Sequence, residues 1–206
     1  MAAAKHKVFI SYHHANDQKY KEALIKFGED NGLFIDASVD TGEIDEKLGD
    51  DEIRQKIRDE YLRDSTVTIV LVGLQTKQRK HVDWEIFSSM FDGTVNKKSG
   101  VLVINLPSTN CTHFTAAHGE AEKRKIYPDN KSWVSVKNRA DYEKRYPHMP
   151  DRITDNLLKK KAKVSVTSWD KVVCDAEKLR FLINATFGDR AQCDYDMSRK
   201  MRRSNS

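Results

Sequence analysis

The sequence predicts an α/β protein with a mostly parallel five-stranded sheet, in the order 2-1-3-4-5, and helices on both faces. Short apolar runs alternate with helical periodicity through the first half of the chain. The runs at residues 66–72 (TVTIVLV) and 100–106 (GVLVINL) lack polar alternation, as strands buried on both faces of a parallel sheet do. A chain of 206 residues also fits one large domain better than an array of domains.

The first strand, the first helix and the second strand follow from apolar spacing. Residues 7–12 (KVFISY) are predicted as the first strand, and residues 33–35 as a short second strand that stops at Asp36. Between them, apolar residues recur at helical spacing from Tyr20 to Phe27. A strand, a helix and a second parallel strand form a right-handed crossover unit.

The next elements continue the alternation. Residues 37–49 are predicted as a loop, and an apolar residue at every fourth position predicts a helix over about 50–63. The third strand is then 66–72, the third helix about 80–91, and the fourth strand 100–106. This order supplies the crossovers that a parallel sheet requires.

The second half of the chain is less regular. Residues 107–150 carry polar loops with few periodic stretches, and a segment of this length predicts small elements of its own. Residues 164–167 predict a fifth strand, and residues 171–187 predict a closing helix. The fold therefore has an enlarged C-terminal half.

The net charge is concentrated at the C-terminus. Lys and Arg total 36 against 31 Asp and Glu, which gives a net charge of +5. Residues 197–206 hold four basic residues and no acid, and we expect 191–206 to be a basic, flexible, solvated tail. Residues 1–190 then form a single domain, with 107–165 as an elaboration. Because no basic stripe interleaved with aromatic residues is present, nucleic acid is not an expected partner.

Apolar and cysteine patterns predict a cytoplasmic protein without membrane segments. The longest strongly apolar stretch, 67–74, is too short to span a bilayer, and no signal peptide is predicted. Three cysteines lie far apart, without a C-x-x-C pair, at Cys111, Cys174 and Cys193. This usage favours a reducing compartment. The C-x-H-x-x-x-x-H spacing at 111–118 has no obvious fourth ligand, so we predict no metal site.

The predicted strand order also predicts where a ligand binds. In such sheets ligands lie outside the carboxyl ends of the strands, where the winding direction reverses. That crevice lies between the loops at 11–16 and 73–80. The 11–16 loop (SYHHAN) contains no glycine, so the dinucleotide fingerprint and the phosphate-binding P-loop are both absent. No acidic pair follows the first strand, so the sequence does not favour a receiver-type phosphoacceptor site.

Glu85 is a candidate ligand-facing residue on the third predicted helix. A helical wheel places it on a narrow face with two serines about one turn later, which leaves room for a ligand. Near the helix N-terminus the macrodipole favours its ionised form. On the wheel alone, a solvated surface glutamate remains the alternative. Trp84 falls on the apolar arc and is expected in the core, and Asp83 is expected to be a capping or first-turn acid.

Three segments in order resemble bacterial TIR-like domains, in particular those of the Thoeris anti-phage defence system. They are VFISYHHAND at 8–17, DSTVTIVLVGLQT at 64–76 and HVDWEIFSSM at 81–90. The resemblance covers about residues 5–106 and is weak beyond them. It implies a flavodoxin-like TIR fold and an NAD-cleaving enzyme whose key glutamate lies on the third helix, a position that only Glu85 occupies.

The resemblance also implies a role for the product and for neighbouring loops. Proteins of this kind act as NAD glycohydrolases or cyclases, with NAD as the substrate and no separate cofactor. The cyclic ADP-ribose isomer that they make activates a partner effector that depletes NAD, and assembly into a homo-oligomer can accompany activation. The family's flexible loop after the second strand corresponds to residues 37–49, which carry the acidic side chains Asp40, Glu43, Asp45 and Glu46.

Five further residues are candidate substrate-binding residues. Ser11, Tyr12 and His13 end the first strand and are candidates for contacts with the nucleotide or its phosphates, with packing or loop hydrogen bonds as the alternative. Asp36 is a candidate for binding a ribose, unless it only ends the second strand. Gln75, after the third strand, is a candidate polar wall of the site.

A single carboxylate is chemically sufficient for cleaving NAD. Nicotinamide leaves a cationic pyridinium as a neutral molecule, so the main requirement is to stabilise an oxocarbenium-like ribose. Water then gives ADP-ribose, whereas a hydroxyl of the distal ribose gives a cyclic product. Two other functions stay open: a TIR-type assembly module without enzymatic activity, and a module that senses a nucleotide without cleaving it.

Overall fold

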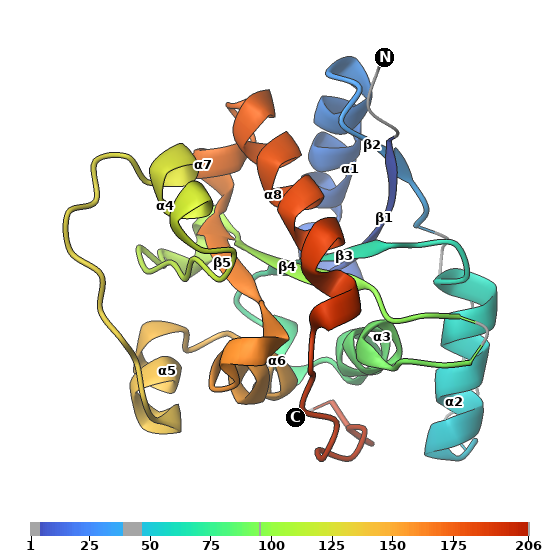
Figure 1. Cartoon of the computed structure of the whole chain (residues 1–206). Helices are drawn as coiled ribbons and strands as arrows, with labels where there is room; N and C mark the ends of the chain where they lie inside the picture. The colour runs from blue at the N-terminus through green and yellow to red at the C-terminus, as the bar shows by residue number, and fades with distance from the viewer. Residues whose placement is uncertain (1–4, 39–46, 95, 206) are drawn as a thin grey trace.

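The computed structural model describes residues 5–38, 47–94 and 96–205, and it confirms the predicted fold class and strand order. Five parallel strands form one sheet in the order β2-β1-β3-β4-β5 (Figure 1). The strands are β1 His6–Ser11, β2 Phe34–Asp36, β3 Val67–Val72, β4 Gly100–Asn105 and β5 Ser165–Ser168. The helices are α1 His14–Asp30, α2 Asp50–Lys56, α3 Lys80–Met90, α4 Glu120–Ile126, α5 Arg139–Arg145, α6 Asp151–Leu157, α7 Trp169–Val172 and α8 Ala176–Asp189.

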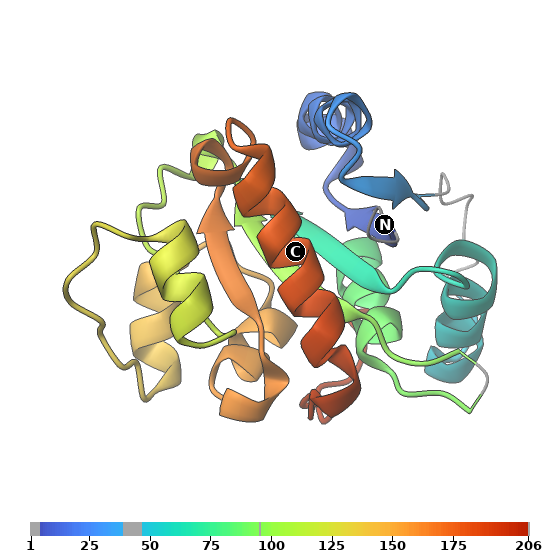
Figure 2. The same cartoon turned by 45° about the horizontal axis from the view of Figure 1, so that its top comes forward.

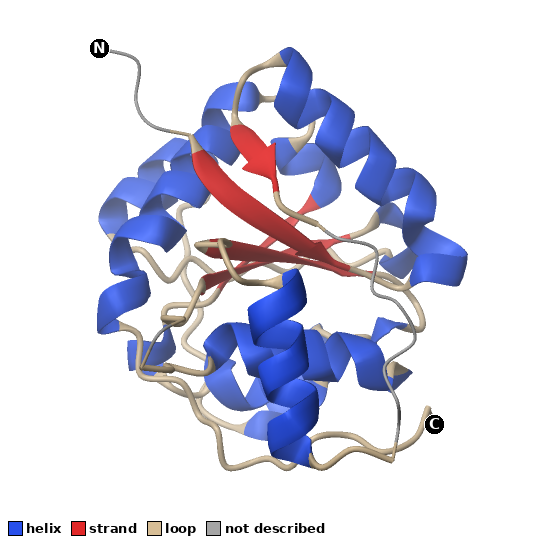
Figure 3. Cartoon of the chain, turned by 90° about the vertical axis from the view of Figure 1, so that its right-hand side faces the viewer, coloured by secondary structure: helices blue, strands red, loops and turns tan. Residues whose placement is uncertain are grey.

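The sheet separates two apolar cores. Successive side chains of β3 point to opposite faces, so Ile69 packs in the core beneath α1 and α8 while Val70 packs in the core beneath α3 and α6. All residues of β3 and β4 are buried, which explains their continuous apolar sequences. Helices lie above and below the sheet in Figure 3, and α8 crosses one face in Figure 2.

Two predicted helices are each divided in the structure. The helix predicted over 50–63 is α2 followed by a π-helical turn, Ile57–Tyr61, in which the Leu62 amide donates to the Ile57 carbonyl. The wider turn lets Ile57 and Leu62 both face the core, each fully buried. The helix predicted over 171–187 is α7 followed by α8, because the Asp175 carboxylate accepts the Lys178 amide and starts a new helix.

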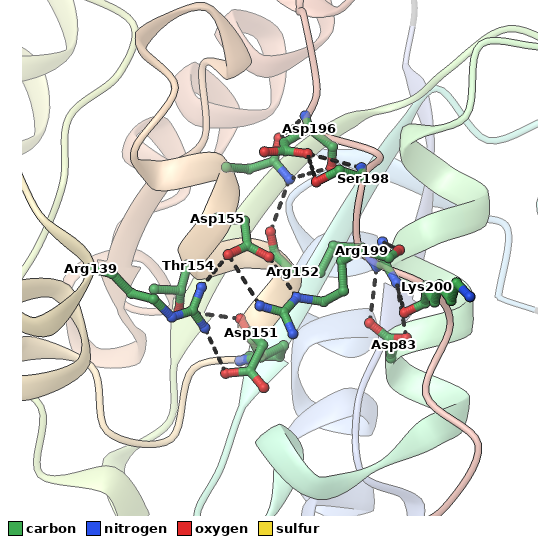
Figure 4. A network of polar contacts seen from close by, with 12 residues as sticks. Asp83, Arg139, Asp151, Arg152, Thr154, Asp155, Asp196, Ser198, Arg199 and Lys200 are labelled. Carbon is green, nitrogen blue, oxygen red and sulfur yellow. Dashed lines mark hydrogen bonds and ion pairs between the residues drawn. The ribbon is translucent and has the colours of Figure 1, made fainter.

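The C-terminal segment, residues 193–205, differs from the solvated tail that the sequence predicts. Met201 is only 4% exposed and packs with Phe9 and Trp84. The fully buried Arg152 donates to the backbone carbonyls of Arg199 and Lys200, as Figure 4 shows. The segment is held because its carbonyl groups satisfy donors that the body of the protein buries.

The basic side chains of this segment are paired with acids of the body. Arg199 forms an ion pair with Asp155, and Arg203 forms one with Asp50. These pairs neutralise the concentration of positive charge that the sequence shows at the C-terminus. Among the described residues, no helix is both long and apolar enough to cross a bilayer.

Candidate active site

Glu85 is buried in the structure rather than solvated on the surface. Helix α3 directs its side chain toward the end of β1, and Glu85 is 3% exposed. Its Oε2 accepts a hydrogen bond of 2.6 Å from the hydroxyl of Ser11, which is fully buried. The fold thus joins two of the predicted site residues, one from the end of β1 and one from α3.

The charge state of Glu85 is set by burial. Burial raises the pKa of Glu85 to about 8, although the Ser11 hydrogen bond and the positive charge of Lys21 act in the opposite direction. Burial therefore outweighs the helix dipole, which the sequence analysis expects to favour the ionised form. A cationic ligand bound beside Glu85 would favour the ionised form of its carboxyl group.

The neighbours of Glu85 on α3 have structural partners. Ser89 shares a hydrogen bond of 2.8 Å with Thr68 of β3. Trp84 is fully buried, which confirms its predicted place in the core. Asp83 lies in the first turn as predicted, but it caps nothing: its carboxylate accepts from Arg152 Nε at 2.9 Å and Nη2 at 3.1 Å.

A cavity of about 300 Å³, here called the α1–α3 cavity, opens where α1 and α3 begin. Ser11 and Glu85 are not in its lining; Tyr12, which follows Ser11, and Val82, one turn before Glu85, are. Its lining comprises Tyr12, His13, His14, Ala15, Arg79, His81, Val82 and Asn205. The Tyr12 ring stacks on the His14 ring at a centroid distance of 4.4 Å. Burial lowers the pKa of His13, and the positive charges of Arg79 and His14 lower it further. The structure therefore places Tyr12 and His13 on this cavity.

Asp36 and Gln75 lie outside the lining of this cavity. Asp36 is exposed, accepts a hydrogen bond of 2.9 Å from the Ser38 amide, and lines a separate cavity of about 640 Å³ with Lys7 and Arg63. It pairs with Val8 of β1, three residues before Ser11, so the short strand β2 ends too early to bring Asp36 to Glu85. Gln75 is exposed, and its Oε1 accepts from the Arg79 guanidinium.

Several residues at this edge of the sheet were not predicted from the sequence. Lys21 is buried on α1, and its positive charge lowers the pKa of Glu85. Asn205 lines the cavity although it is far from α1 and α3 in the sequence. Arg79 lies in the loop 73–80, which strand order had marked as one wall of the crevice. The carboxylate of Asp17 lies against Gly73, the residue after β3, so a Cβ at position 73 would require the Asp17 side chain to shift.

The acidic residues 40, 43, 45 and 46 of the predicted loop lie outside the described residues. In the described part of the chain, no three His, Cys, Asp or Glu side chains are grouped as metal ligands. Cys111 Sγ instead donates to the carbonyl of Arg145 at 3.4 Å.

The parallel 2-1-3-4-5 sheet with helices on both faces is the flavodoxin-like arrangement that TIR-like domains share. The family model described as Thoeris protein ThsB, TIR-like domain, matches residues 9–111, which is half of the chain. The chain belongs to this family. A comparison with curated protein sequences gave no match. The matched region contains the last three residues of β1 and the whole of β3 and α3, and therefore Ser11 and Glu85.

Proposed function

We propose that this Thoeris TIR protein cleaves NAD between nicotinamide and ribose and forms a cyclic ADP-ribose isomer. The observation that carries the proposal is Glu85, a buried carboxyl group held by Ser11 at the carboxyl edge of the sheet, one turn of α3 after the cavity residue Val82. The product would be the messenger for a partner effector that depletes NAD.

The first step breaks the bond between ribose C1′ and the pyridinium nitrogen. The bonding electrons go to that nitrogen, so nicotinamide leaves as a neutral molecule and positive charge develops on the ribose. An ionised Glu85 stabilises this charge, and the Ser11 hydroxyl orients the carboxylate. Glu85 has a raised pKa, and the cationic pyridinium of NAD favours its ionised form on binding.

The second step captures the ribose cation. A hydroxyl of the distal ribose attacks C1′ and forms the C–O bond that closes the ring, and its proton passes to solvent. Attack by water gives ADP-ribose instead. The burial of Glu85 and Ser11 favours the cyclic product because it limits the access of water. NAD is the substrate, and the proposal needs no other cofactor.

The test is chromatography of NAD incubated with the purified protein and with lysate of infected cells that express it. We expect nicotinamide and a cyclic product, and a loss of about 100-fold to 1000-fold in rate for Glu85→Gln. Glu29→Gln, which changes an exposed acid of α1, is the matched control. Equal turnover by Glu85→Gln would remove Glu85 from the mechanism.

Two outcomes favour the other candidate functions. Binding of NAD without consumption, in both preparations, would indicate a nucleotide-sensing module. Partner binding that is insensitive to Glu85→Gln, with no NAD binding or turnover, would indicate a TIR-type assembly module. Infected-cell lysate is included because activity can need a trigger from infection or self-assembly, which a dilute purified protein lacks.

A further inference from the structure

We propose that the α1–α3 cavity binds the diphosphate of the dinucleotide, with His13 and Arg79 as the side chains that donate to the phosphate oxygens. Naming NAD as the source of that diphosphate rests on the proposed function. The anion-binding property of the cavity does not depend on it.

The lining of the cavity is suited to negative charge. Counted over the described residues, it contains one guanidinium, three imidazoles and no side-chain carboxylate. His13 and Arg79 are also the residues that precede α1 and α3, and neither side chain caps its own helix. The two helices, of 17 and 11 residues, therefore begin at the same cavity, and the positive ends of their dipoles favour an anion there.

Two buried nitrogen atoms support this assignment. His13 is 9% exposed, and its Nδ1 has no hydrogen-bond partner among the described residues. Arg79 Nε is likewise buried and without a partner in the described ranges. Gln75 accepts from the other end of the Arg79 guanidinium and so restricts its orientation. Both side chains line the cavity, so a small rotation of either would bring its unpaired nitrogen to a bound phosphate oxygen and offset the cost of its burial.

The cavity lies at the right place relative to Glu85. Val82, in the lining, precedes Glu85 by one turn of α3, a rise of about 4.5 Å. Tyr12, also in the lining, follows Ser11, whose hydroxyl contacts Glu85. In NAD the diphosphate is attached to C5′ of the ribose that carries nicotinamide. A diphosphate in the cavity would therefore place that ribose next to the carboxyl group.

The experiment compares ADP with adenosine by calorimetry on the full chain at low ionic strength. We expect ADP to bind at least about tenfold more tightly than adenosine, because only ADP carries the diphosphate. Arg79→Gln should lose about tenfold in ADP affinity and leave adenosine unchanged. Arg124→Gln, on the exposed face of α4, should change neither. Equal affinities of the wild type for ADP and adenosine would overturn the inference.

A second variant covers the case in which Arg79→Gln disturbs the start of α3. Arg79→Lys keeps the charge and should retain part of the preference for ADP, and His13→Gln should reduce it. ADP affinities equal to wild type in all three folded variants would also overturn the inference. An Arg79-dependent preference for ADP in a protein that never consumes NAD would retain the cavity assignment and refute the proposed reaction.

Discussion

At the scale of single residues, Glu85 shows that environment decides what a carboxyl group does. The hydrogen bond from Ser11 and the charge of Lys21 both favour the anion, yet burial outweighs them and the pKa rises to about 8. Ionising a carboxyl group that is buried and protonated at neutral pH costs free energy, because the charge is removed from water. Such a group is ready to respond to a positively charged ligand.

The raised pKa predicts how stability depends on pH. The unfolded state releases the proton near pH 4.5 and the folded state near pH 8, so folding gains stability from Glu85 below pH 4.5 and loses it as the pH rises to 8. Glu85→Gln has no such dependence. In urea denaturation, the free energy of unfolding of Glu85→Gln should therefore rise relative to that of the wild type between pH 4.5 and pH 8, by up to about 5 kcal/mol.

The control for this prediction is Glu29→Gln, because an exposed glutamate should give a difference from wild type that stays nearly constant with pH. A constant difference for Glu85→Gln as well would show that the pKa of Glu85 is near its usual value in the folded protein.

At the scale of elements, α3 holds three consecutive side chains in three different environments. Asp83 pairs with Arg152 of α6, Trp84 enters the core and donates to the Arg202 carbonyl at 2.7 Å, and Glu85 reaches β1. A rotation of about 100° per residue separates them, so each contact restricts the helix from a different side. The position of Glu85 therefore depends on the partners of its neighbours.

The ion pair between Asp83 and Arg152 predicts a large effect of one substitution. Arg152 is fully buried, so Asp83→Ala leaves its guanidinium without a carboxylate. We expect a loss of about 3–5 kcal/mol in the free energy of unfolding, measured with urea. Asp129→Ala, at an exposed position, should stay within about 0.5 kcal/mol of wild type. A loss below about 1 kcal/mol for Asp83→Ala would show that the pair contributes little.

At the scale of the whole molecule, the C-terminal segment connects parts that are far apart in sequence. Arg203 donates to the Leu48 carbonyl near α2, Arg199 pairs with Asp155 of α6, and Asn205 Oδ1 accepts the Lys80 amide at the start of α3 at 3.0 Å. Asn205 also lines the α1–α3 cavity. The last residues thus help to position the helix that carries Glu85.

Adjacent residues of this segment provide a matched pair of variants. Met201 packs in the core beside Trp84, whereas the side chain of Lys200 is exposed. We expect Met201→Ala to lower the free energy of unfolding by about 2–4 kcal/mol and Lys200→Ala to change it by less than about 0.5 kcal/mol. Similar small effects of both variants in urea denaturation would mean that the segment is solvated, as its composition suggests.

The contrast between Asp36 and Ser11 shows how far sequence reasoning reaches at the site. Both follow predicted strands, and the rule that ligands bind at the carboxyl edge applies to both. Only Ser11 meets Glu85, because β2 is three residues long and ends beside Val8 rather than beside the end of β1. Strand periodicity reveals which residues form strands but not the register in which neighbours align.

The amino-acid sequence by itself determined the strands, the helices and the place of Glu85 on its helix, because these follow from hydrophobic periodicity along the chain. The alternation of strands and helices then predicted the parallel sheet, its order and the edge at which the candidate site lies, through the usual topology of such folds. Only the tertiary structure decided that Glu85 is buried against Ser11 with a raised pKa, that His13 and Arg79 share a cavity, and that a basic chain end packs into the core. Those properties depend on desolvation and on contacts between distant segments, which local patterns do not encode.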